Sequence, residues 1–349
     1  MIRNVLICTT QVPFTRGGAE DHVEGLRRAL VAAGHATEVV ALPFKWYPPM
    51  EIMRGAMAWR MLDLSAANGR PVDLVIGMKF PAYLVAHPNK VLWILHQHRS
   101  AYNLWGTAFD DLSTFPEGPR VREWIKHCDE KLIPDAKKVF ANSRTVADRL
   151  KKYNNLESEV LYHPPPLADR LRAGEQSDYL FYPSRLEPQK RQTLLIEAMK
   201  YVGAPVKAVF AGSSSDASHY QALARQHGVA DRISFRGFVS EDDLIGLYAN
   251  SLGVCYLPFD EDYGYVTLQG MLSAKPMIVT SDSGGATEFV EDQITGGIVQ
   301  PDPKAIAEAI DQLYADRNRA RLMGEKGLEK ISSMNLGWSN VVDKIISAA

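Results

Sequence analysis

The alternation of two sequence patterns constrains the fold most strongly. Short runs of β-branched and aromatic residues alternate with amphipathic stretches along almost the whole chain. In the first half the strand patterns are Val5–Thr9, Thr37–Ala41, Leu74–Gly77, Val91–Leu95 and Val139–Ala141. The helical patterns there are Glu20–Ala33, Val121–Ile133 and Thr145–Lys152. Because parallel strands are joined by crossover helices, the alternation predicts an α/β fold built on doubly wound parallel sheets.

A second alternation follows the segment His163–Pro166. Its strand patterns are Leu180–Pro183, Val206–Ala211, Ile233–Arg236, Val254–Leu257 and Met277–Thr280. Its helical patterns are Thr193–Met199, Tyr220–Gln226, Asp242–Tyr248, Val266–Leu272, Ala305–Leu313 and, near the end, Trp338–Ile346. Proline fixes φ and has no amide donor, so His163–Pro166 is interpreted as a hinge between domains, although a surface loop within one domain fits the same composition.

A chain of 349 residues exceeds what one hydrophobic core usually supports, so two domains are expected. They are a Rossmann-like N-terminal domain of residues 1–166 and a Rossmann-like C-terminal domain of residues 167–334. The last helix, within about 335–349, is followed by no strand and is expected to cross back to the first domain. Ligands of such domains bind at the carboxyl ends of the strands, here in a cleft that the two domains face.

Charge and cysteine usage exclude several classes of protein. The net charge is -2, and no basic stripe with interleaved aromatic residues suggests a nucleic-acid partner. The first half has a small basic excess, which suits an anionic acceptor or lipid headgroups, or is simply scattered solvated charge. Cys8, Cys128 and Cys255 are widely spaced, and Cys8 and Cys255 lie in strand patterns, which predicts buried thiols at these two positions rather than disulfides. With no signal-peptide layout and no apolar run near 20 residues, a cytoplasmic protein is expected.

Two loops that follow strands carry groups suited to an anion. Gly17–Gly18 precede a helix, where backbone amides and the helix dipole favour negative charge, although a glycine pair is more often just a turn. In the second half, Ser184–Arg185 follow a strand and Lys190 precedes a helix. Arginine and lysine at such positions can neutralise a diphosphate.

A third loop, Asp260–Tyr265, follows another strand. Gly264 and the amides of Tyr265 and Val266, at the start of the next helix, could bind a phosphate, with Tyr263 beside them. Glu261 in the loop and Gln269 in the helix could accept hydrogen bonds from sugar hydroxyls. An acidic loop that simply caps the helix is the alternative. A further glycine pair, Gly284–Gly285, follows the next strand.

His96 follows the strand pattern Val91–Leu95 and could donate to a substrate. The His-x-His pattern with His98 suggests zinc, but no Cys, Asp or Glu lies nearby at ligand spacing, so no metal site is predicted. Ala101–Gly106 and the methionine-rich segment Met50–Leu64 could line an acceptor groove, or could pack in the core.

Together these motifs resemble glycosyltransferase family 4, whose members are retaining enzymes with the GT-B fold. The family's glycine-rich first loop resembles Gly17–Glu20, and its Arg-Leu-x-x-x-Lys signature resembles Arg185–Lys190. Its Glu-x7-Glu motif resembles Glu261–Gln269, and its later glycine pair before a glutamate resembles Gly284–Glu288. His96 matches the histidine that the family places near the transferred sugar.

The resemblance implies transfer of a hexosyl group from a nucleoside diphosphate-sugar, with UDP or GDP expected, to a hydroxyl of a polysaccharide, glycolipid or small glycoside. It implies no metal or other cofactor. Catalytic roles fall to His96, Arg185, Lys190 and Glu261, and donor binding to Gly17, Gly18, Ser184, Tyr263, Gly264, Tyr265, Val266 and Gln269. The protein is expected to be a monomer or a homodimer that can bind peripherally to the inner face of a membrane.

The sequence departs from the family at Gln269, where a glutamate usually binds the ribose hydroxyls. Glutamine still forms hydrogen bonds but loses their charge-assisted strength, so Gln269→Glu is expected to tighten donor binding. The departure leaves two alternatives open, a sugar-nucleotide-binding protein that has lost turnover and a sugar-nucleotide epimerase.

Overall fold

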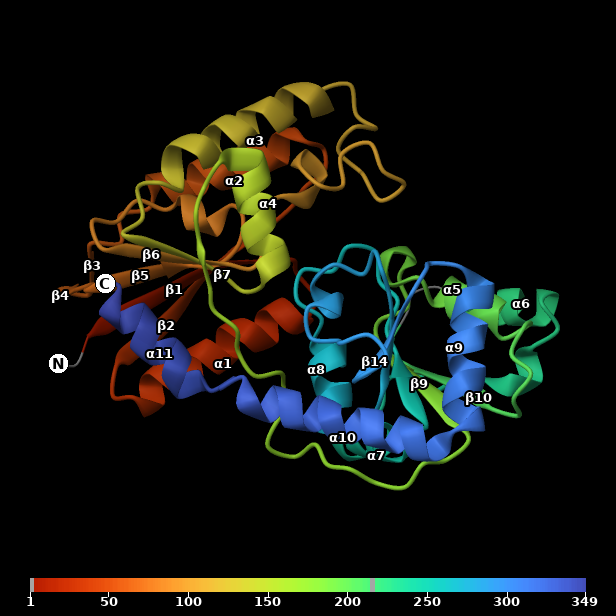
Figure 1. The fold of residues 1–349 in the computed structure, drawn as a ribbon. Helices are drawn as coiled ribbons and strands as arrows, with labels where there is room; N and C mark the ends of the chain where they lie inside the picture. Colours follow the sequence, from red (N-terminus) through yellow and green to blue (C-terminus); the bar gives the residue numbers. More distant parts are fainter. Residues whose placement is uncertain (1–2, 214–216) are drawn as a thin grey trace. The chain divides into compact units, whose positions relative to one another are not determined.

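The computed structural model describes residues 3–213 and 217–349, which form two compact units (Figure 1). Unit 1 comprises Met1–His163 and Gly337–Ala349, and unit 2 comprises Pro164–Leu336. Each unit contains a six-stranded sheet whose pairings are all parallel. The predicted fold class, two doubly wound parallel-sheet domains, is therefore confirmed.

The sheet of unit 1 has the strand order β2-β1-β5-β6-β7-β8. Its strands are β1 (Asn4–Gln11), β2 (Ala36–Pro43), β5 (Leu74–Gly77), β6 (Lys90–Ile94), β7 (Lys138–Ala141) and β8 (Glu159–Val160). A small antiparallel hairpin, β3 (Ala66–Ala67) with β4 (Arg70–Pro71), lies outside this sheet. Because the long strands run parallel, their carboxyl ends meet at one edge.

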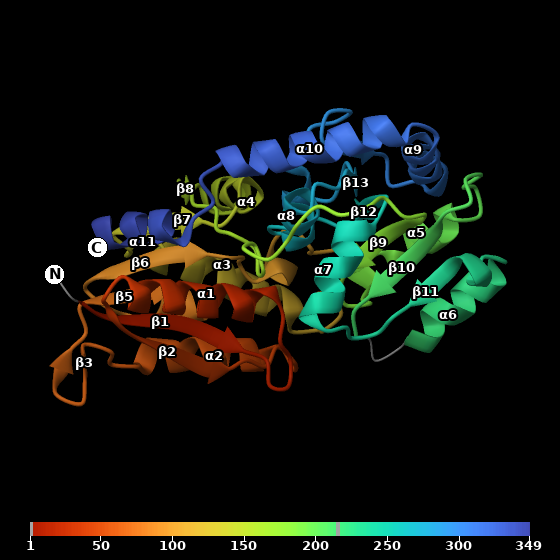
Figure 2. The ribbon, with the colours of Figure 1, turned by 90° about the horizontal axis from the view of Figure 1, so that it is seen from below.

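Helices cover both faces of this sheet (Figures 1 and 2). One face carries α1 (Gly18–Ala32) and α11 (Trp338–Ser347), and the other α2 (Met50–Met61), α3 (Gly118–Leu132) and α4 (Arg144–Asn154). Alternate residues of β6 point to the two layers: Val91 packs in the cluster with α1 and α11, Leu92 in the cluster with α2 and α3. Burial on both faces explains the continuous apolar strand pattern.

The terminal helix α11 packs closely against α1. A Cβ atom placed on Gly25 of α1 would lie 2.3 Å from the Trp338 ring, so glycine is needed for this approach. Trp338 also packs near the buried rings of His22, Trp93 and His163. Burial lowers the pKa of His22 to about 3, so these rings act as neutral packing groups.

A buried carboxyl group lies on α3. Asp129 is 0% exposed and accepts hydrogen bonds from the hydroxyls of Tyr83 (3.0 Å) and Tyr102 (2.8 Å) and from the Gln97 amide (3.3 Å). Burial raises the pKa of Asp129 to about 7, while these donors act in the opposite direction. The Asp129 carboxyl group therefore titrates near neutral pH.

The sheet of unit 2 has the order β11-β10-β9-β12-β13-β14. Its strands are β9 (Tyr179–Pro183), β10 (Lys207–Ala211), β11 (Ile233–Phe235), β12 (Gly253–Cys255), β13 (Met277–Thr280) and β14 (Gly296–Val299). Its helices are α5 (Gln192–Ala198), α6 (Ala217–Gln226), α7 (Glu241–Asn250), α8 (Tyr265–Leu272), α9 (Pro303–Ala315) and α10 (Arg317–Ser333). Helix α10 packs against α8, whereas α5 packs against α6 and α9 on the other face (Figure 1).

The sequence prediction missed the helices α2 and α10, the strand β14 and the short strands β3, β4 and β8. Met50–Leu64, expected either to line a groove or to pack in the core, largely forms α2, whose Ile52, Ala56 and Trp59 are buried, so part of it packs in the core. Strand β14 begins with two glycines, which weaken a strand pattern. Helix α10 is rich in charged residues, and Gly324 within it approaches the carbonyl of Ala274 too closely for any side chain.

Candidate active site

A lysine–glutamate ion pair lies at the carboxyl edge of the unit 2 sheet. Lys190, in the 3-10 turn after β9, pairs with Glu261, in the loop after β12. Each side chain is 17% exposed, so both are largely shielded but can still reach a ligand. Lys190 Nζ also donates to the Tyr256 hydroxyl at 3.3 Å. The structure thus brings together two of the residues to which the sequence assigned catalytic roles.

Two buried tyrosines fix this ion pair from the protein side. The Tyr182 hydroxyl accepts from the amide of Leu257 at 2.9 Å and donates to the carbonyl of Lys190. The Tyr256 ring packs against Tyr182, 6.1 Å between centroids. Burial raises the pKa of both phenols well above the ordinary value, so both keep their protons. The sequence prediction included neither side chain, although Tyr182 lies near the end of β9 and Tyr256 directly follows β12.

The next residue, Arg191, connects the turn after β9 to residues at the ends of β12 and β13 through hydrogen bonds. It has φ 50° and forms a bidentate pair with Asp282, with N–O distances of 2.8 and 2.7 Å. It also donates to the carbonyls of Leu257 and Pro258, each at 2.8 Å, and to the Thr280 hydroxyl at 2.9 Å. Burial acts to raise the pKa of Asp282, but the Arg191 guanidinium lowers it overall. Arg191 with these partners forms a clamp between three neighbouring strand ends.

The glycine loops after β12 and β13 lie side by side. The amide of Gly285 donates to the carbonyl of Glu261 at 2.7 Å, and the amide of Glu261 donates to Ser283 at 3.1 Å. Gly284 and Gly264 have φ 59° and 89°, and a Cβ on either would lie within 2.9 Å of backbone atoms of the other loop. Two glycines are therefore required for this approach. Gly264 precedes α8, so the Tyr265 and Val266 amides belong to a first helical turn, which has no intrahelical acceptors.

Arg185, predicted as catalytic, and the predicted donor-binding residues Ser184 and Tyr263 have defined partners. Arg185 pairs with Glu187 at 3.0 Å and is 43% exposed, more than Lys190. The Ser184 hydroxyl accepts from the Gln192 amide at 2.7 Å. Tyr263 is 5% exposed and packs edge-to-face on Tyr265 and Phe289. Its ring is therefore part of the loop's core.

The amide of Gln269 forms a hydrogen bond at each end. Its oxygen accepts from the Tyr248 hydroxyl at 2.9 Å, and its nitrogen donates to the carbonyl of Pro166 at 3.1 Å. The side chain is only 8% exposed. One N–H and one lone pair are left over in this arrangement, so a ribose contact stays a prediction.

In unit 1, His96 lines a pocket of about 270 Å³ at the carboxyl edge of the sheet. Half-buried aromatic residues Phe44 and Trp46 form part of its wall, and Lys79 contributes a cation. The Nδ1 atom of His96 lies 2.7 Å from the carbonyl of Gln97, which orients the ring. A volume of this order accommodates a small ligand such as one sugar ring.

The first glycine loop is held by its own glutamate. The amide of Gly17 donates to Glu20 Oε2 at 2.8 Å, and Glu20 Oε1 pairs with Lys79 at 3.2 Å. Gly18 begins α1. Because its amide already has a carboxylate partner, Gly17 would have to exchange Glu20 for an incoming anion. The predicted anion role of this loop stays a prediction.

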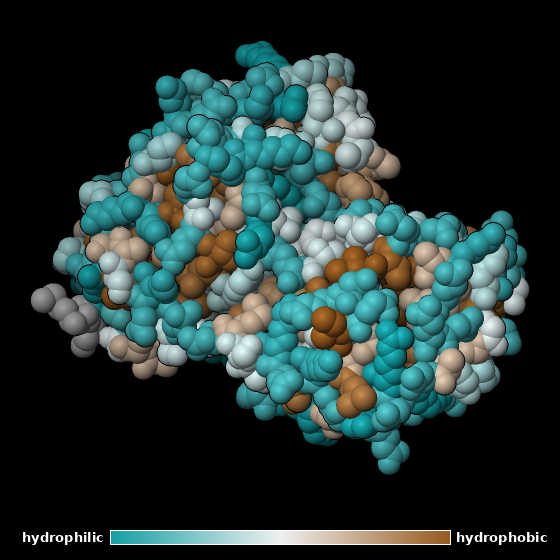
Figure 3. All heavy atoms as spheres, viewed as in Figure 1, coloured by the Kyte–Doolittle hydropathy of each residue, from teal (hydrophilic) through white to brown (hydrophobic). Residues whose placement is uncertain are grey.

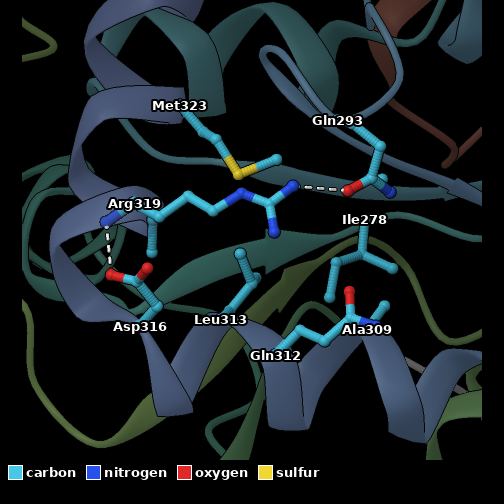
Figure 4. A pocket seen from close by; sticks show the side chains of 10 residues that line it. Ile278, Gln293, Ala309, Gln312, Leu313, Asp316, Arg319 and Met323 are labelled. Atoms are coloured by element: carbon cyan, nitrogen blue, oxygen red, sulfur yellow. Dashed lines mark hydrogen bonds between the residues drawn. The ribbon is translucent and has the colours of Figure 1, made fainter.

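A second cavity lies among α9, α10, β13 and β14 (Figure 4). It encloses about 20 Å³, and Arg319 extends across it to Gln293 at 2.7 Å. This space holds about one water molecule and lies away from the strand ends that carry Lys190 and Glu261. It is a packing feature of unit 2.

Within residues 3–213 and 217–349, no group of three His, Cys, Asp or Glu side chains could hold a metal ion, and no helix has the length and apolarity to span a bilayer. The face seen in Figure 3 is largely hydrophilic, with separate apolar patches.

Comparison with known proteins shows what the chain is similar to. Residues 167–330, which lie within unit 2 and include Lys190 and Glu261, match the family Glycosyl transferases group 1. HepE of Anabaena, solved with UDP and glucose, matches with a TM-score of 0.71 and 18% identity over 99% of this chain and 98% of its own. Sucrose-phosphate synthase of Thermosynechococcus elongatus matches with a TM-score of 0.76 over the same shares, at 18% identity. The fold is that of GT-B glycosyltransferases.

Particular relatives extend over most of the sequence. An uncharacterized glycosyltransferase of Methanocaldococcus jannaschii is 25% identical over 87% of this chain and 87% of its own length. A GDP-mannose-dependent alpha-(1-6)-phosphatidylinositol monomannoside mannosyltransferase of Mycobacterium tuberculosis is 24% identical over 98% of this chain and 96% of its own. Together with the family match, these relatives support a GT-B glycosyltransferase.

Proposed function

We propose that the chain is a retaining glycosyltransferase of family 4 that moves a hexosyl group from a nucleoside diphosphate-sugar to an acceptor hydroxyl without a metal ion. The observation that carries this proposal is the pairing of Lys190 with Glu261 at the strand edge of unit 2, next to the first turn of α8. The cation and the helix amides suit the diphosphate of such a donor, and the carboxylate at the same edge suits its sugar hydroxyls.

In the proposed reaction, the bond between the anomeric carbon and the diphosphate oxygen breaks, and the acceptor oxygen bonds to the same face of that carbon. The acceptor proton passes to the departing diphosphate. Lys190 stabilises the charge that develops on this leaving group, with Arg185 and the amides after Gly264 assisting. Glu261 binds a hydroxyl of the transferred sugar and so positions its anomeric carbon.

The pocket of unit 1 is proposed to bind the acceptor. The ring faces of Phe44 and Trp46 suit the apolar faces of a sugar ring, and His96 would contact the reacting sugar. Polysaccharide, glycolipid and small-glycoside acceptors all present such a ring. We place the protein in the cytoplasm, as a monomer or homodimer, with peripheral contact at a membrane for lipid-linked acceptors.

A binding protein without turnover is the second candidate, favoured by one observation. The amide of Gln269, where the family has a glutamate, already bonds to Tyr248 and Pro166. Fewer remaining hydrogen bonds would weaken contact with the ribose.

The test is a thermal-shift screen with UDP-, GDP-, ADP- and dTDP-sugars, UDP-glucose and GDP-mannose among them, because a ligand that binds the folded state raises the melting temperature. The stabilising donor is then incubated with the protein, and release of its nucleoside diphosphate is measured. Release supports glycosyl transfer, and an isomerised donor supports an epimerase. Saturable binding with no change in the donor supports the binding protein, and no shift with any donor refutes all three.

A further inference from the structure

Gln97 lines the pocket of unit 1, and its side chain belongs to a closed network of hydrogen bonds. The amide nitrogen of Gln97 donates to Asn154 Oδ1 at 2.7 Å and to Asp129 Oδ2 at 3.3 Å. The Asn154 nitrogen donates to the Tyr102 hydroxyl at 3.2 Å, and that hydroxyl donates to Asp129 Oδ2 at 2.8 Å. This Gln97 network connects the loop after β6 to α3 and to the last residue of α4.

The donors and acceptors of the Gln97 network allow one arrangement of protons when Asp129 is ionised. A carboxylate only accepts, so both Gln97 and Tyr102 must donate to Asp129. The Tyr102 hydroxyl has a single proton, so its oxygen accepts from the Asn154 nitrogen. The Asn154 oxygen then faces Gln97, and both amide hydrogens of Gln97 are used. Gln97 is 6% exposed and Asp129 is 0% exposed, so water competes little with these bonds.

The main chain of Gln97 acts on the imidazole of His96. The Gln97 carbonyl oxygen lies 2.7 Å from His96 Nδ1. A carbonyl carries no proton, so this hydrogen bond requires the proton of the imidazole to be on Nδ1. In the neutral imidazole, Nε2 is then the acceptor. A neutral His96 in this state would accept a hydrogen bond from a sugar hydroxyl.

The Gln97 network holds the carbonyl that makes this contact. Strand β6 ends at Ile94, so Gln97 lies beyond the residues that the sheet pairs. Its side chain fixes the segment instead, through hydrogen bonds to two other elements. Without the side-chain amide, the carbonyl could rotate away from Nδ1. The imidazole could then take the form with its proton on Nε2, which free histidine prefers.

We propose that Gln97 is a positioning residue for sugar transfer, whose anchored carbonyl keeps the His96 proton on Nδ1 and so makes Nε2 the acceptor for a hydroxyl of the reacting sugar. This inference rests on the proposed function, which has the reacting sugar contact His96. It assigns to Gln97 a role that acts through His96 and that does not involve the diphosphate.

Two variants open the Gln97 network. Gln97→Met keeps the length of the side chain but removes the amide, and Asn154→Ala removes the opposite corner at a half-buried position. Thr107→Val is the matched control, because it removes the hydrogen bond from the Thr107 hydroxyl to the Leu104 carbonyl (2.8 Å), in the same unit but outside the network.

The first measurement is the protonation of the two imidazole nitrogens. Heteronuclear NMR spectra of protein with isotope-labelled histidine are recorded at about pH 8, where neutral imidazole prevails. The signals that disappear in His96→Gln identify His96. Wild type and Thr107→Val should carry the proton on Nδ1, whereas Gln97→Met and Asn154→Ala should show a larger share of the form with the proton on Nε2.

The second measurement is turnover. Release of UDP or GDP from UDP-glucose or GDP-mannose should be at least about 5-fold slower in Gln97→Met, because a smaller fraction of the protein can accept at Nε2. The Kd of free UDP and GDP, measured by isothermal titration, should stay within about 2-fold, since a nucleoside diphosphate without sugar makes no contact with His96 under this proposal. Gln97→Met combined with His96→Gln should be no slower than His96→Gln alone.

Four results would overturn the inference while leaving the proposed function intact: a wild-type His96 with its proton on Nε2, unchanged protonation in both network variants, additive losses in the double variant, or equal losses of turnover in Gln97→Met and Thr107→Val. Equal losses would indicate general destabilisation of unit 1. A wild-type protein that binds UDP or GDP but releases neither from its donor would overturn the proposed function and the role in sugar transfer together. The His96 spectra would still decide whether Gln97 fixes the imidazole.

Discussion

Gln269→Glu separates two accounts of the same position. In the structure, the Gln269 nitrogen donates to the carbonyl of Pro166 and its oxygen accepts from Tyr248. A glutamate keeps the second bond and loses the first, at about 1 kcal/mol, and it directs a carboxylate oxygen at a carbonyl oxygen in a site that is 8% exposed.

The cost has an upper bound because the new carboxyl can bind a proton instead. Holding a group of ordinary pKa about 4.3 protonated at pH 7 costs about 4 kcal/mol. The expected loss of unfolding free energy at pH 7 is therefore about 2–4 kcal/mol. The pKa of the new carboxyl is raised in the folded state, so the deficit should shrink as the pH falls toward 5.

Urea unfolding at pH 5 and pH 7 measures this loss. The control is Gln269→Met, which removes both hydrogen bonds but adds no titrating group, so its deficit should not vary with pH. If Gln269→Glu is as stable as wild type at pH 7 and binds UDP or GDP more tightly, the amide does not anchor the segment at Pro166. The ribose contact expected from the sequence would then be correct.

Three further substitutions test other parts of the structure by urea unfolding. Gly25→Ala should lower the free energy of unfolding by at least about 2 kcal/mol, because the new methyl group would overlap Trp338. The control Gly246→Ala, in α7 with open space around it, should be neutral or stabilising by up to about 1 kcal/mol. Equal effects of the two substitutions would contradict the packing of α11 on α1. Because burial raises the pKa of Asp129 from the ordinary 3.8 to about 7, the free energy of unfolding should fall with rising pH between about 4 and 7, by up to about 1.4 kcal/mol per pH unit. Asp129→Asn should remove this pH dependence. If the dependence persists in Asp129→Asn, Asp129 is not the group that titrates. Arg191→Lys should lower the free energy of unfolding by about 2–4 kcal/mol, since a lysine cannot form the bidentate pair and the carbonyl contacts together. A loss below about 0.5 kcal/mol would show that Arg191 does not hold these loops together.

The sequence predicts the parallel-sheet architecture well because its signal is local. A buried parallel strand must be apolar on both faces, and patterns such as Leu74–Gly77 and Met277–Thr280 coincide with β5 and β13. Elements whose stability depends on distant contacts were not predicted. Helix α10 has little apolar periodicity of its own and is held by packing that includes the close approach of Gly324 to Ala274.

The site shows the same division. Lys190 and Glu261 carry charges at strand ends, where sequence patterns suggest chemistry. Tyr256 and Arg191 act through partners far away in the chain, and nothing local distinguishes Tyr256 from an apolar core residue. The two bonds of Gln269 depend on where Tyr248 and Pro166 lie in the folded unit, which no spacing reveals.

The most direct test of the proposed chemistry is the rate of nucleoside diphosphate release in Lys190→Ala. The matched control is Lys200→Ala, an exposed lysine outside the site. If Lys190 stabilises the departing diphosphate, its loss should lower kcat at least about 100-fold, the typical effect of one preorganised donor, while Lys200→Ala stays within about 2-fold of wild type. A Lys190→Ala variant that releases UDP or GDP at near the wild-type rate would contradict the account.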